Sequence, residues 1–407
     1  LSEAKGMVIK MTIYKKSAMQ RLAETSDGME LWWDSSPLIF KTWAEQVLKK
    51  TSGKEKNIMA EWLRVLFDEK KPENTLFSGV TTNPKLTRKV LDLLPEEVNP
   101  IIDRIIKDNP AKSNYELAWE VYCAITKKGA RLYMPLFEKS GYRKGYVSAQ
   151  VDPRLVTDVK KMLHQALILK NLSPNIMIKC PGSREGIYLI RILTSMGIPT
   201  NSTLVFDIPQ VVEVAKAVKR GHEIGEENGA DFSQWRSVIT IMMARFEERE
   251  QYAESAKEVG IELTEELKRW TGIAIAKKAH AILADKSNGY LSKLLLCSSR
   301  VGPSKDEVLH IEKVAGGNMV YTINPEMIND FMIIYKEKDI YSQIDGPVPD
   351  DIAGKLLKIP YFKAGYEVDG IKKEDFVNQP SFVFTRDQFS GSMKEIEEYV
   401  VERKQAV

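Results

Sequence analysis

One unit recurs along this chain: a short apolar run, a polar residue where the run ends, a tight turn and an amphipathic stretch. The clearest copies are the segments 76–84, 146–153, 175–182 and 318–325. In three of them an Asn or Asp stands directly before Pro, a pairing that caps and starts a helix. Each copy is therefore predicted to form a strand, a tight turn and a helix.

Four more apolar runs bring the number of expected strands to eight. They span residues 29–34, 197–206, 235–243 and 291–299, and helix-like sequence follows each of them. Eight strands that alternate with helices form the order that closes into a barrel. An open doubly wound sheet uses the same units, but no GxGxxG follows the first strand and eight regular units favour closure. We therefore expect an α/β fold, the (β/α)8 TIM barrel.

The connections between these units differ in length, which predicts helices beyond the eight of the barrel. Residues 38–74 and 87–143 show helical apolar spacing, and residues 244–290 are expected to form two further helices. The segment 331–379 contains Gly and Pro clusters and is expected to be irregular. It leads through 380–389 to a final charged helix over residues 392–404.

The chain of 407 residues is long for one ordinary domain, and it suits one barrel with insertions or an appendage. We expect an N-terminal lead-in over 1–28, the barrel over 29–335, and a C-terminal extension over 336–407. The extension is expected to end in a helix packed on the barrel.

The composition of the chain argues against several classes of function. Hydrophobic residues make up 43% and charged residues 28%, as in soluble globular proteins. A net charge of +3, without a dense basic stripe, gives no sign of nucleic-acid binding. No apolar run is long enough for a membrane span, and no signal-peptide pattern is visible. Three cysteines without a CxxC pair favour a reducing cytoplasm over a disulfide framework.

The small number of histidines also argues against metal sites and catalytic triads that need histidine. The chain has only four histidines, and none has metal-ligand spacing with another His or with a Cys: His164, His222, His280 and His310. We therefore expect no bound metal, and a Ser-His-Asp triad would have few histidines to draw on.

In a barrel of this kind the active site is built at the C-terminal ends of the strands. The polar residues at or just after those ends comprise one lysine, one carboxylate, several amides and hydroxyls, and two arginines. They are Asp34, Asn83, Gln150, Lys179, Asn201, Thr203, Thr240, Arg245, Ser298, Arg300 and Asn324.

This set has chemical meaning if the side chains face one another. Lys179 ends an apolar strand, where burial favours the neutral amine that can attack a ketone and form an imine. Asp34 is the only carboxylate at a strand end, so it is the candidate base for cleaving the neighbouring C–C bond. Arg245 and Arg300 could bind a phosphate bidentately.

Each of these residues also has a structural explanation. A lysine at a strand end is more often solvated or salt-bridged than nucleophilic. Asn83 and Asn324 have the position of helix N-caps. Thr203 and Thr240 could be ordinary β-branched strand residues, and Arg245 could belong to a charged helix surface. Taken singly, none of them indicates an enzyme.

Taken in order, these motifs resemble the transaldolase family, from Trp33 to Ile328. GVTTNP (79–84) is similar to the family's second-strand motif, and NIMIKCPGSREGI (175–187) to the motif that carries the Schiff-base lysine. GIPTNSTLVFDIPQ (197–210), SVITIMMAR (237–245) and CSSR (297–300) resemble the motifs that follow. The long stretch between Gln210 and Ser237 is similar to that of the longer bacterial members.

The resemblance implies a role for each matching residue. Lys179 is the implied nucleophile, Asp34 the implied base, and Asn83, Asn201 and Thr203 contact the substrate or its water. The hydroxyl-plus-arginine motifs imply a phosphate site formed by Thr240, Arg245, Ser298 and Arg300.

The third-strand motif departs from the usual pattern. It commonly ends in a catalytic Glu, whereas this chain has Gln150, an amide that can position water but cannot carry a proton. The fructose-6-phosphate aldolase branch also has Gln at this place, although its nearby Tyr is replaced here by Met242. Thr240 stands where Ser is usual.

The leading hypothesis is a class I aldolase that forms a Schiff base with a ketose phosphate and needs no cofactor. If a second aldehyde captures the dihydroxyacetone enamine on Lys179, the enzyme is a transaldolase of the pentose phosphate pathway. If a proton captures it, the enzyme is a fructose-6-phosphate-type aldolase. Two alternatives stay open: a non-catalytic sugar-phosphate-binding barrel, and purely structural roles for the polar set. The partner is expected to be a phosphorylated sugar, and a homodimer is an option.

Overall fold

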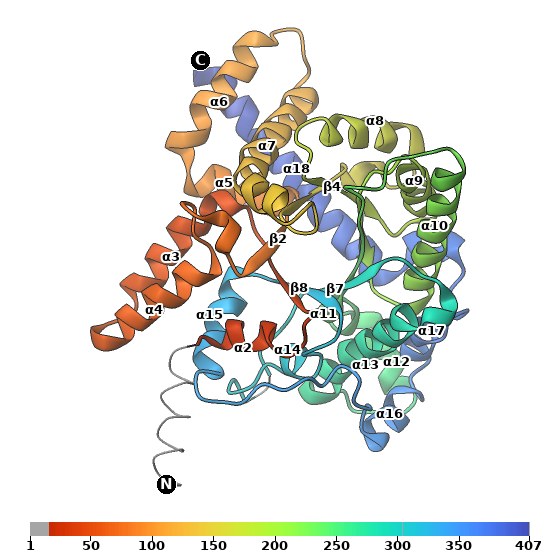
Figure 1. Cartoon of the computed structure of the whole chain (residues 1–407). Coiled ribbons are helices and arrows are strands. Elements are labelled where there is room, and N and C mark those ends of the chain that lie inside the picture. The colour runs from red at the N-terminus through yellow and green to blue at the C-terminus, as the bar shows by residue number, and fades with distance from the viewer. Residues whose placement is uncertain (1–15, 303, 407) are drawn as a thin grey trace.

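The computed structural model describes residues 16–302 and 304–406 of the chain. Eight strands close into a barrel in sequence order, and every neighbouring pair is parallel (Figure 1). The strands are β1 (Glu30–Trp33), β2 (Phe77–Thr81), β3 (Tyr146–Gln150), β4 (Ile176–Pro181), β5 (Thr200–Val205), β6 (Ser237–Met242), β7 (Lys293–Cys297) and β8 (Met319–Ile323). This confirms the predicted (β/α)8 barrel.

The barrel interior is packed so tightly that one position requires glycine. A Cβ atom on Gly79 of β2 would lie 2.4 Å from Cε2 of Trp32 on β1. Below this contact, Glu30 bonds to Arg236 and Lys293 at the N-terminal end of the strands. Burial alone would raise the pKa of Glu30, but these two cations lower it to about 2. The candidate active site lies at the opposite, C-terminal end of the barrel.

Helices surround the barrel and account for the rest of the chain. Those that follow the strands are α5 (Pro84–Leu93), α8 (Val159–Lys170), α9 (Arg184–Ser195), α10 (Ile208–Glu227), α11 (Met243–Glu247), α12 (Glu250–Glu258), α13 (Glu265–Ala284), α14 (Leu309–Glu312) and α15 (Pro325–Ile334). Additional helices are α2 (Ala18–Ala23), α3 (Phe40–Lys49), α4 (Gly53–Leu66), α6 (Pro95–Asp108), α7 (Asn114–Lys139), α16 (Asp350–Leu356), α17 (Pro360–Tyr366) and α18 (Pro380–Ala406). Short 3-10 turns are η1 (Pro37–Ile39), η2 (Pro72–Asn74), η3 (Pro153–Leu155), η4 (Lys286–Asn288) and η5 (Lys373–Asn378).

The two Asn-Pro pairs start α-helices as predicted, whereas Asp152-Pro153 starts only the 3-10 turn η3, and α8 begins at Val159 with Asp158 as its cap. The side chain of Asn83 accepts from the backbone N–H of Leu86 at 3.0 Å, and Asn324 accepts from Met327 at 2.8 Å. Each cap satisfies one of the free N–H groups of a first helical turn, and Pro at the next position lacks such a group.

Three expectations about the helices were wrong. Residues 244–290 contain α11, α12 and α13 rather than two helices, and the segment 331–379 forms α16, α17 and η5 rather than irregular coil. The final helix begins at Pro380, twelve residues before Ser392. Its first part is aromatic-rich, but Phe382, Thr385 and Phe389 are buried on one face at helical spacing.

The predicted lead-in (1–28) lies partly outside the described residues. From residue 16 on, it contains α2, which opens with a capping box between Ser17 and Gln20. Arg21 of α2 donates to the backbone carbonyls of Tyr335 and Lys336, at the end of α15.

The described residues contain neither a membrane-spanning helix nor a cluster of metal-binding side chains. None of the described helices combines the length and apolarity needed to cross a membrane. Within the described ranges, no group of three or more His, Cys, Asp and Glu side chains is placed to hold a metal ion.

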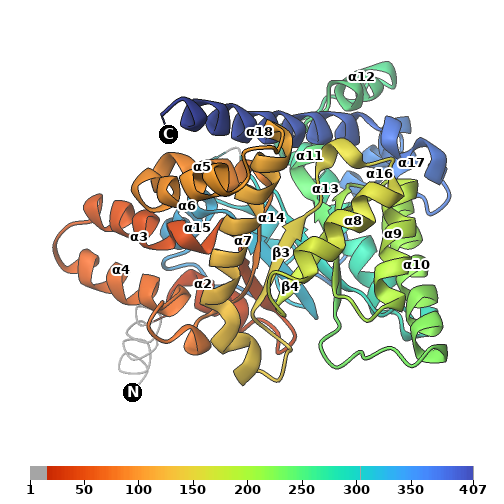
Figure 2. The same cartoon turned by 90° about the horizontal axis from the view of Figure 1, so that it is seen from above.

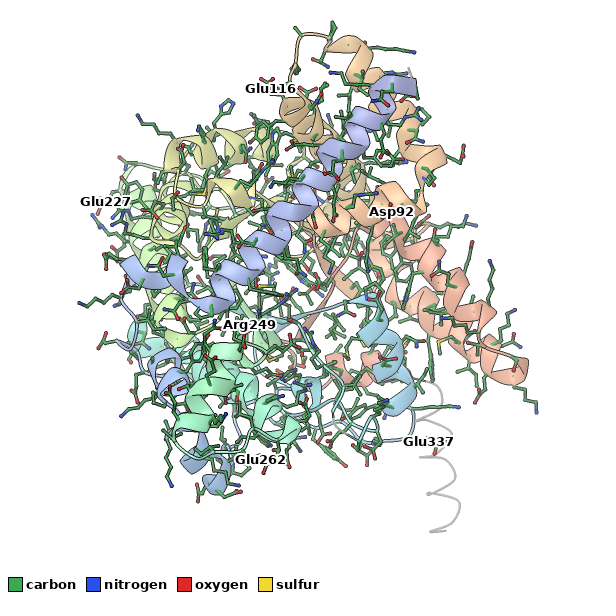
Figure 3. All side chains as sticks on the ribbon, turned by 180° about the vertical axis from the view of Figure 1, so that it is seen from behind. Asp92, Glu116, Glu227, Arg249, Glu262 and Glu337 are labelled. Carbon is green, nitrogen blue, oxygen red and sulfur yellow. The ribbon has the colours of Figure 1, made fainter. Side chains whose placement is uncertain are left out.

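The C-terminal helix α18 crosses one end of the barrel. It contacts α5, η3 and α11, which follow β2, β3 and β6, and it also contacts β5 itself. Because these elements all lie at the C-terminal ends of strands, α18 lies over the end where the candidate site is built. Figure 2 shows α18 along the upper edge of the molecule, and Figure 3 shows it running diagonally across this face.

Candidate active site

Lys179 lies on β4 and is 5% exposed. Its Nζ donates to the backbone carbonyl of Thr82 at 3.3 Å. Burial lowers the pKa of the Lys179 amine, while the charge of Asp34 and the Cys297 thiol act in the opposite direction. A buried amine with a lowered pKa, bonded to a carbonyl rather than paired with an acid, has the properties of a nucleophile.

Asp34 follows β1 and is held by a chain of hydroxyl groups. Thr81 donates to its carboxylate at 2.7 Å, and the hydroxyls of Thr81 and Thr322 lie 2.7 Å apart. Since the single hydroxyl proton of Thr81 goes to Asp34, Thr322 donates to Thr81. Burial raises the pKa of Asp34, and the nearby charge of Lys179 opposes that rise. The carboxylate is thus oriented and more basic than usual, as a proton acceptor needs to be.

Gln150 and Thr203 flank Lys179 on the neighbouring strands. Gln150 is the register partner of Lys179, and Thr203 pairs with Pro181, two residues further along β4. The side-chain Oε1 of Gln150 and Oγ1 of Thr203 are buried and have no hydrogen-bond partner among the described residues. Buried polar atoms of this kind are where an ordered water or a substrate hydroxyl is expected.

Asn201 and Thr240 bond to each other. Thr240 donates to the side-chain carbonyl of Asn201 at 2.6 Å, and the amide of Asn201 donates to Ser148 at 2.9 Å. Asn201 and Ser148 are fully buried, and Thr240 is 2% exposed. The structure therefore brings these two predicted substrate-binding residues together in one hydrogen-bond chain that links β3, β5 and β6.

A β-bulge ends β5 beside Thr203. The register of β5 and β6 shifts between Ser202 and Val205, and Leu204 takes a left-handed conformation with φ of 55°. Gln210 of α10 fixes this bulge, because its amide donates to the carbonyls of Leu204 and Gly182 and accepts the N–H of Phe206. Bulges often redirect side chains next to active sites, and this one sets the backbone next to Thr203.

Three of the four predicted phosphate residues, Arg245, Ser298 and Arg300, lie at a second part of the site, whereas Thr240 bonds to Asn201. Burial lowers the pKa of Arg245, and the charge of Arg300 lowers it further. The carbonyl of Ser298, a residue with φ of 66°, accepts the N–H of Ala244. Arg300 bonds bidentately to Glu248 at 2.7 and 2.9 Å.

A buried network fixes the backbone of this second part. The N–H of Arg300 donates to Nδ1 of His310, so the ring proton lies on Nε2, 3.1 Å from Glu247. Glu247 also binds Arg269. His310 and Glu247 have no exposed side-chain surface, and the loop after β7 is therefore anchored to α11, α13 and α14.

Several residues of the site were not singled out from the sequence. Thr81, Thr322 and Ser148 form the hydroxyl contacts just described, and Cys297 lies close enough to affect the pKa of Lys179. All four lie on barrel strands. Thr81, Ser148 and Thr322 precede the predicted Asn83, Gln150 and Asn324 by two residues, so strict alternation could have identified these three. Cys297 directly precedes the predicted Ser298, and alternation does not identify it. Gln388 of α18, which accepts from Arg245 at 2.7 Å, left no such signal.

Comparison with known proteins agrees with this geometry. The sequence model of the Transaldolase/Fructose-6-phosphate aldolase family matches residues 63–368. A transaldolase of Thiobacillus denitrificans is 29% identical over 262 residues, covering 60% of this chain and 71% of that protein. One from Helicobacter pylori is 27% identical over 303 residues, covering 73% and 83%.

A transaldolase of Trichodesmium erythraeum is 26% identical over 275 residues and covers 62% of this chain. The family match spans most of the chain, including seven of the eight strands and the buried Lys179. The chain therefore belongs to the transaldolase/fructose-6-phosphate aldolase family and is a transaldolase-like aldolase.

Proposed function

We propose that the chain transfers or releases a dihydroxyacetone unit from a ketose phosphate through a Schiff base on Lys179. The observation that carries this proposal is the environment of Lys179: a buried amine with a lowered pKa at the C-terminal end of the barrel, with Asp34 nearby.

In the proposed reaction, the neutral Nζ attacks the ketone carbonyl of the donor, and loss of water gives an iminium. Asp34 takes the proton of the C4 hydroxyl, the C3–C4 bond breaks and an aldehyde leaves. The bonding electrons flow into the iminium, so that Lys179 holds an enamine. Gln150 and Thr203 hold the water that is released when the imine forms and consumed when it is later hydrolysed, and this assignment accounts for their unpartnered oxygen atoms.

Arg245, Ser298 and Arg300 are assigned to the phosphate of the substrate. Two guanidinium groups close enough to lower the pKa of Arg245 favour a dianion between them. Asn83, Asn201 and Thr240 are assigned to sugar hydroxyls or to the residues that hold them.

Asn83 also has a structural role, because its side chain caps α5. The buried bonds of Asn201 to Ser148 and Thr240 likewise orient its amide. We also propose a cytoplasmic location, which the three buried and free cysteines support. The homodimer stays a prediction, which sedimentation equilibrium tests.

Borohydride trapping with fructose 6-phosphate tests the proposal. We expect one adduct by intact mass, mapped to Lys179 by peptide sequencing and lost in Lys179→Ala. Lys277 is the informative comparison, because burial also lowers its pKa, to about 8, but it bonds to backbone carbonyls away from the barrel mouth. An adduct on Lys277, or none in the parent protein, would refute the assignment.

A further inference from the structure

The C-terminal helix α18 touches the phosphate part of the site directly. Gln388 accepts from Nη2 of Arg245 at 2.7 Å, and the hydroxyl of Ser381 donates to the backbone carbonyl of Arg245 at 3.1 Å. The ring of Phe384 lies 3.8 Å from the guanidinium of Arg249. This helix begins at Pro380, beyond residue 368, where the family match ends. These contacts are therefore made by residues that the family match does not cover.

Arg245 has a buried hydrogen-bond donor that no described residue accepts. Its Nε is buried without an acceptor among the described residues, and the buried hydroxyl of Thr385, also on α18, has no partner there either. Burial lowers the pKa of Arg245, and Arg300 adds like charge. Glu248 partly offsets this charge but is bonded to Arg300. On α18 the guanidinium of Arg245 lies over the ring of Phe384 and bonds to Gln388, and both of these side chains are neutral.

We propose that Gln388 is a substrate-binding residue that acts together with Arg245 on the phosphate group of the sugar. A neutral amide suits this task. Its carbonyl oxygen orients the guanidinium without neutralising the charge, and its NH2 group stays available to donate to a phosphate oxygen. A carboxylate at the same position would orient Arg245 equally well but would cancel its charge and repel the dianion. The proposal rests on the function proposed above and makes α18 part of the site.

The isosteric variant Gln388→Glu distinguishes a role of Gln388 in phosphate binding from a role in stabilising the fold. If Gln388 only supports the fold, a Glu paired with Arg245 should serve as well or better. If it binds phosphate, the variant should keep or raise its melting temperature in buffer and lose affinity for phosphate. Gln388→Met, which keeps the length but removes the amide, should lose less affinity because it brings no negative charge.

Inorganic phosphate is the probe, and its dissociation constant is measured by calorimetry on the full-length chain. We expect at least a tenfold rise in Gln388→Glu and a smaller rise in Gln388→Met. Lys394→Gln is the matched control, because it changes the charge of α18 by the same amount at an exposed position and should bind phosphate like the parent. Unchanged affinity in Gln388→Glu, or equal losses in the control, would overturn the proposal, as would a parent protein that binds no phosphate.

Borohydride trapping on the same variants keeps this inference distinct from the proposed function. Dihydroxyacetone has no phosphate, so Gln388→Glu should form its Lys179 adduct at nearly the parental rate while its KM for fructose 6-phosphate rises at least tenfold. If the parent forms no adduct but Gln388→Glu still weakens phosphate binding, the proposed function fails and the assignment of Gln388 stands. If the parent forms the adduct and Gln388→Glu keeps the parental KM for fructose 6-phosphate, the proposed function stands and the assignment of Gln388 fails.

Discussion

Gln150 and Lys179 are register partners on β3 and β4, and Oε1 of Gln150 is buried without a hydrogen-bond partner among the described residues. The amide therefore lies beside the amine that would form the imine. The backbone N–H of Gln150 is held by the hydroxyl of Tyr122 on α7 at 2.8 Å. Gln150 is thus positioned to orient a water molecule at Lys179, and Tyr122 holds its backbone in place. The amide cannot itself transfer a proton.

Asp34→Asn should allow imine formation and block C–C cleavage, because an amide cannot accept the hydroxyl proton. We expect the borohydride adduct with fructose 6-phosphate to accumulate with the intact sugar, so that its mass exceeds that of a dihydroxyacetone adduct. Asp68→Asn, in a surface loop after α4, serves as the control. Cleavage at the parental rate in Asp34→Asn would show that another group is the base.

Arg245→Ala and Arg300→Ala should each raise KM for phosphorylated donors far more than for dihydroxyacetone. Loss of one charge-assisted contact is worth on the order of 1.5–3 kcal/mol, or roughly ten- to a hundredfold. Arg245→Ala should have the larger effect, since Arg300 must give up its bidentate pair with Glu248 to bind phosphate. Equal effects on both donors would mean that neither arginine contacts the phosphate.

The barrel could be predicted because its signals are local. Alternating apolar runs give the strands, and the Asn83-Pro84 and Asn324-Pro325 pairs give two helix starts, so no long-range contact is needed. Expected strands were longer than observed ones, since the quoted runs included turn residues such as Thr82 and Asn83. The start of α18 was missed because a segment rich in Phe and Val has no helix signal beyond its spacing.

The contacts inside the site are less accessible from sequence. A Lys or Asp at a strand end can be placed by alternation and barrel geometry, as Lys179 and Asp34 were. The bond between Arg245 and Gln388 joins residues 143 positions apart on elements of unrelated type. Likewise, the bond from Thr240 to Asn201 depends on which side chains satisfy each other after the strands pair. Such partners are determined by tertiary packing.

Asp207 should make stability depend on pH. It caps α10 by accepting the N–H of Gln210 and is 1% exposed. Burial raises its pKa from 3.8 to about 7, against the effect of that hydrogen bond. Its contribution is present below pH 3.8 and is lost as pH rises toward 7, which destabilises the folded chain by on the order of 4 kcal/mol at higher pH.

Asp207→Asn keeps the cap and removes this ionisation. The free energy of unfolding in urea should therefore favour the variant increasingly as pH rises from about 4 to about 7, and the difference should level off above that. Asp158 also caps a helix but is more exposed, and its backbone hydrogen bond lowers its pKa, so Asp158→Asn should show no such gain. A difference between Asp207→Asn and the parent that is constant with pH would mean that Asp207 is ionised in the folded chain throughout.

Gln150→Glu should change the fate of the enamine on Lys179. The new carboxylate can accept and donate a proton beside the amine, whereas the parent must pass protons through water or the hydroxyl of Thr203. We expect activity to acquire a new ionisation and the products to shift toward transfer. The measurement partitions one labelled ketose phosphate between free dihydroxyacetone and a new ketose, with an acceptor aldehyde present.

Gln150→Met is the matched control for this experiment, because it keeps the length of the side chain but can neither hold water nor carry a proton. It should slow imine formation without altering the ratio of transfer to cleavage, since the fate of the enamine would then depend on water and acceptor alone. A ratio and a pH profile that are the same in Gln150→Glu and the parent would show that this position does not direct the enamine. In that case the choice between transfer and cleavage would have to be made where the acceptor binds.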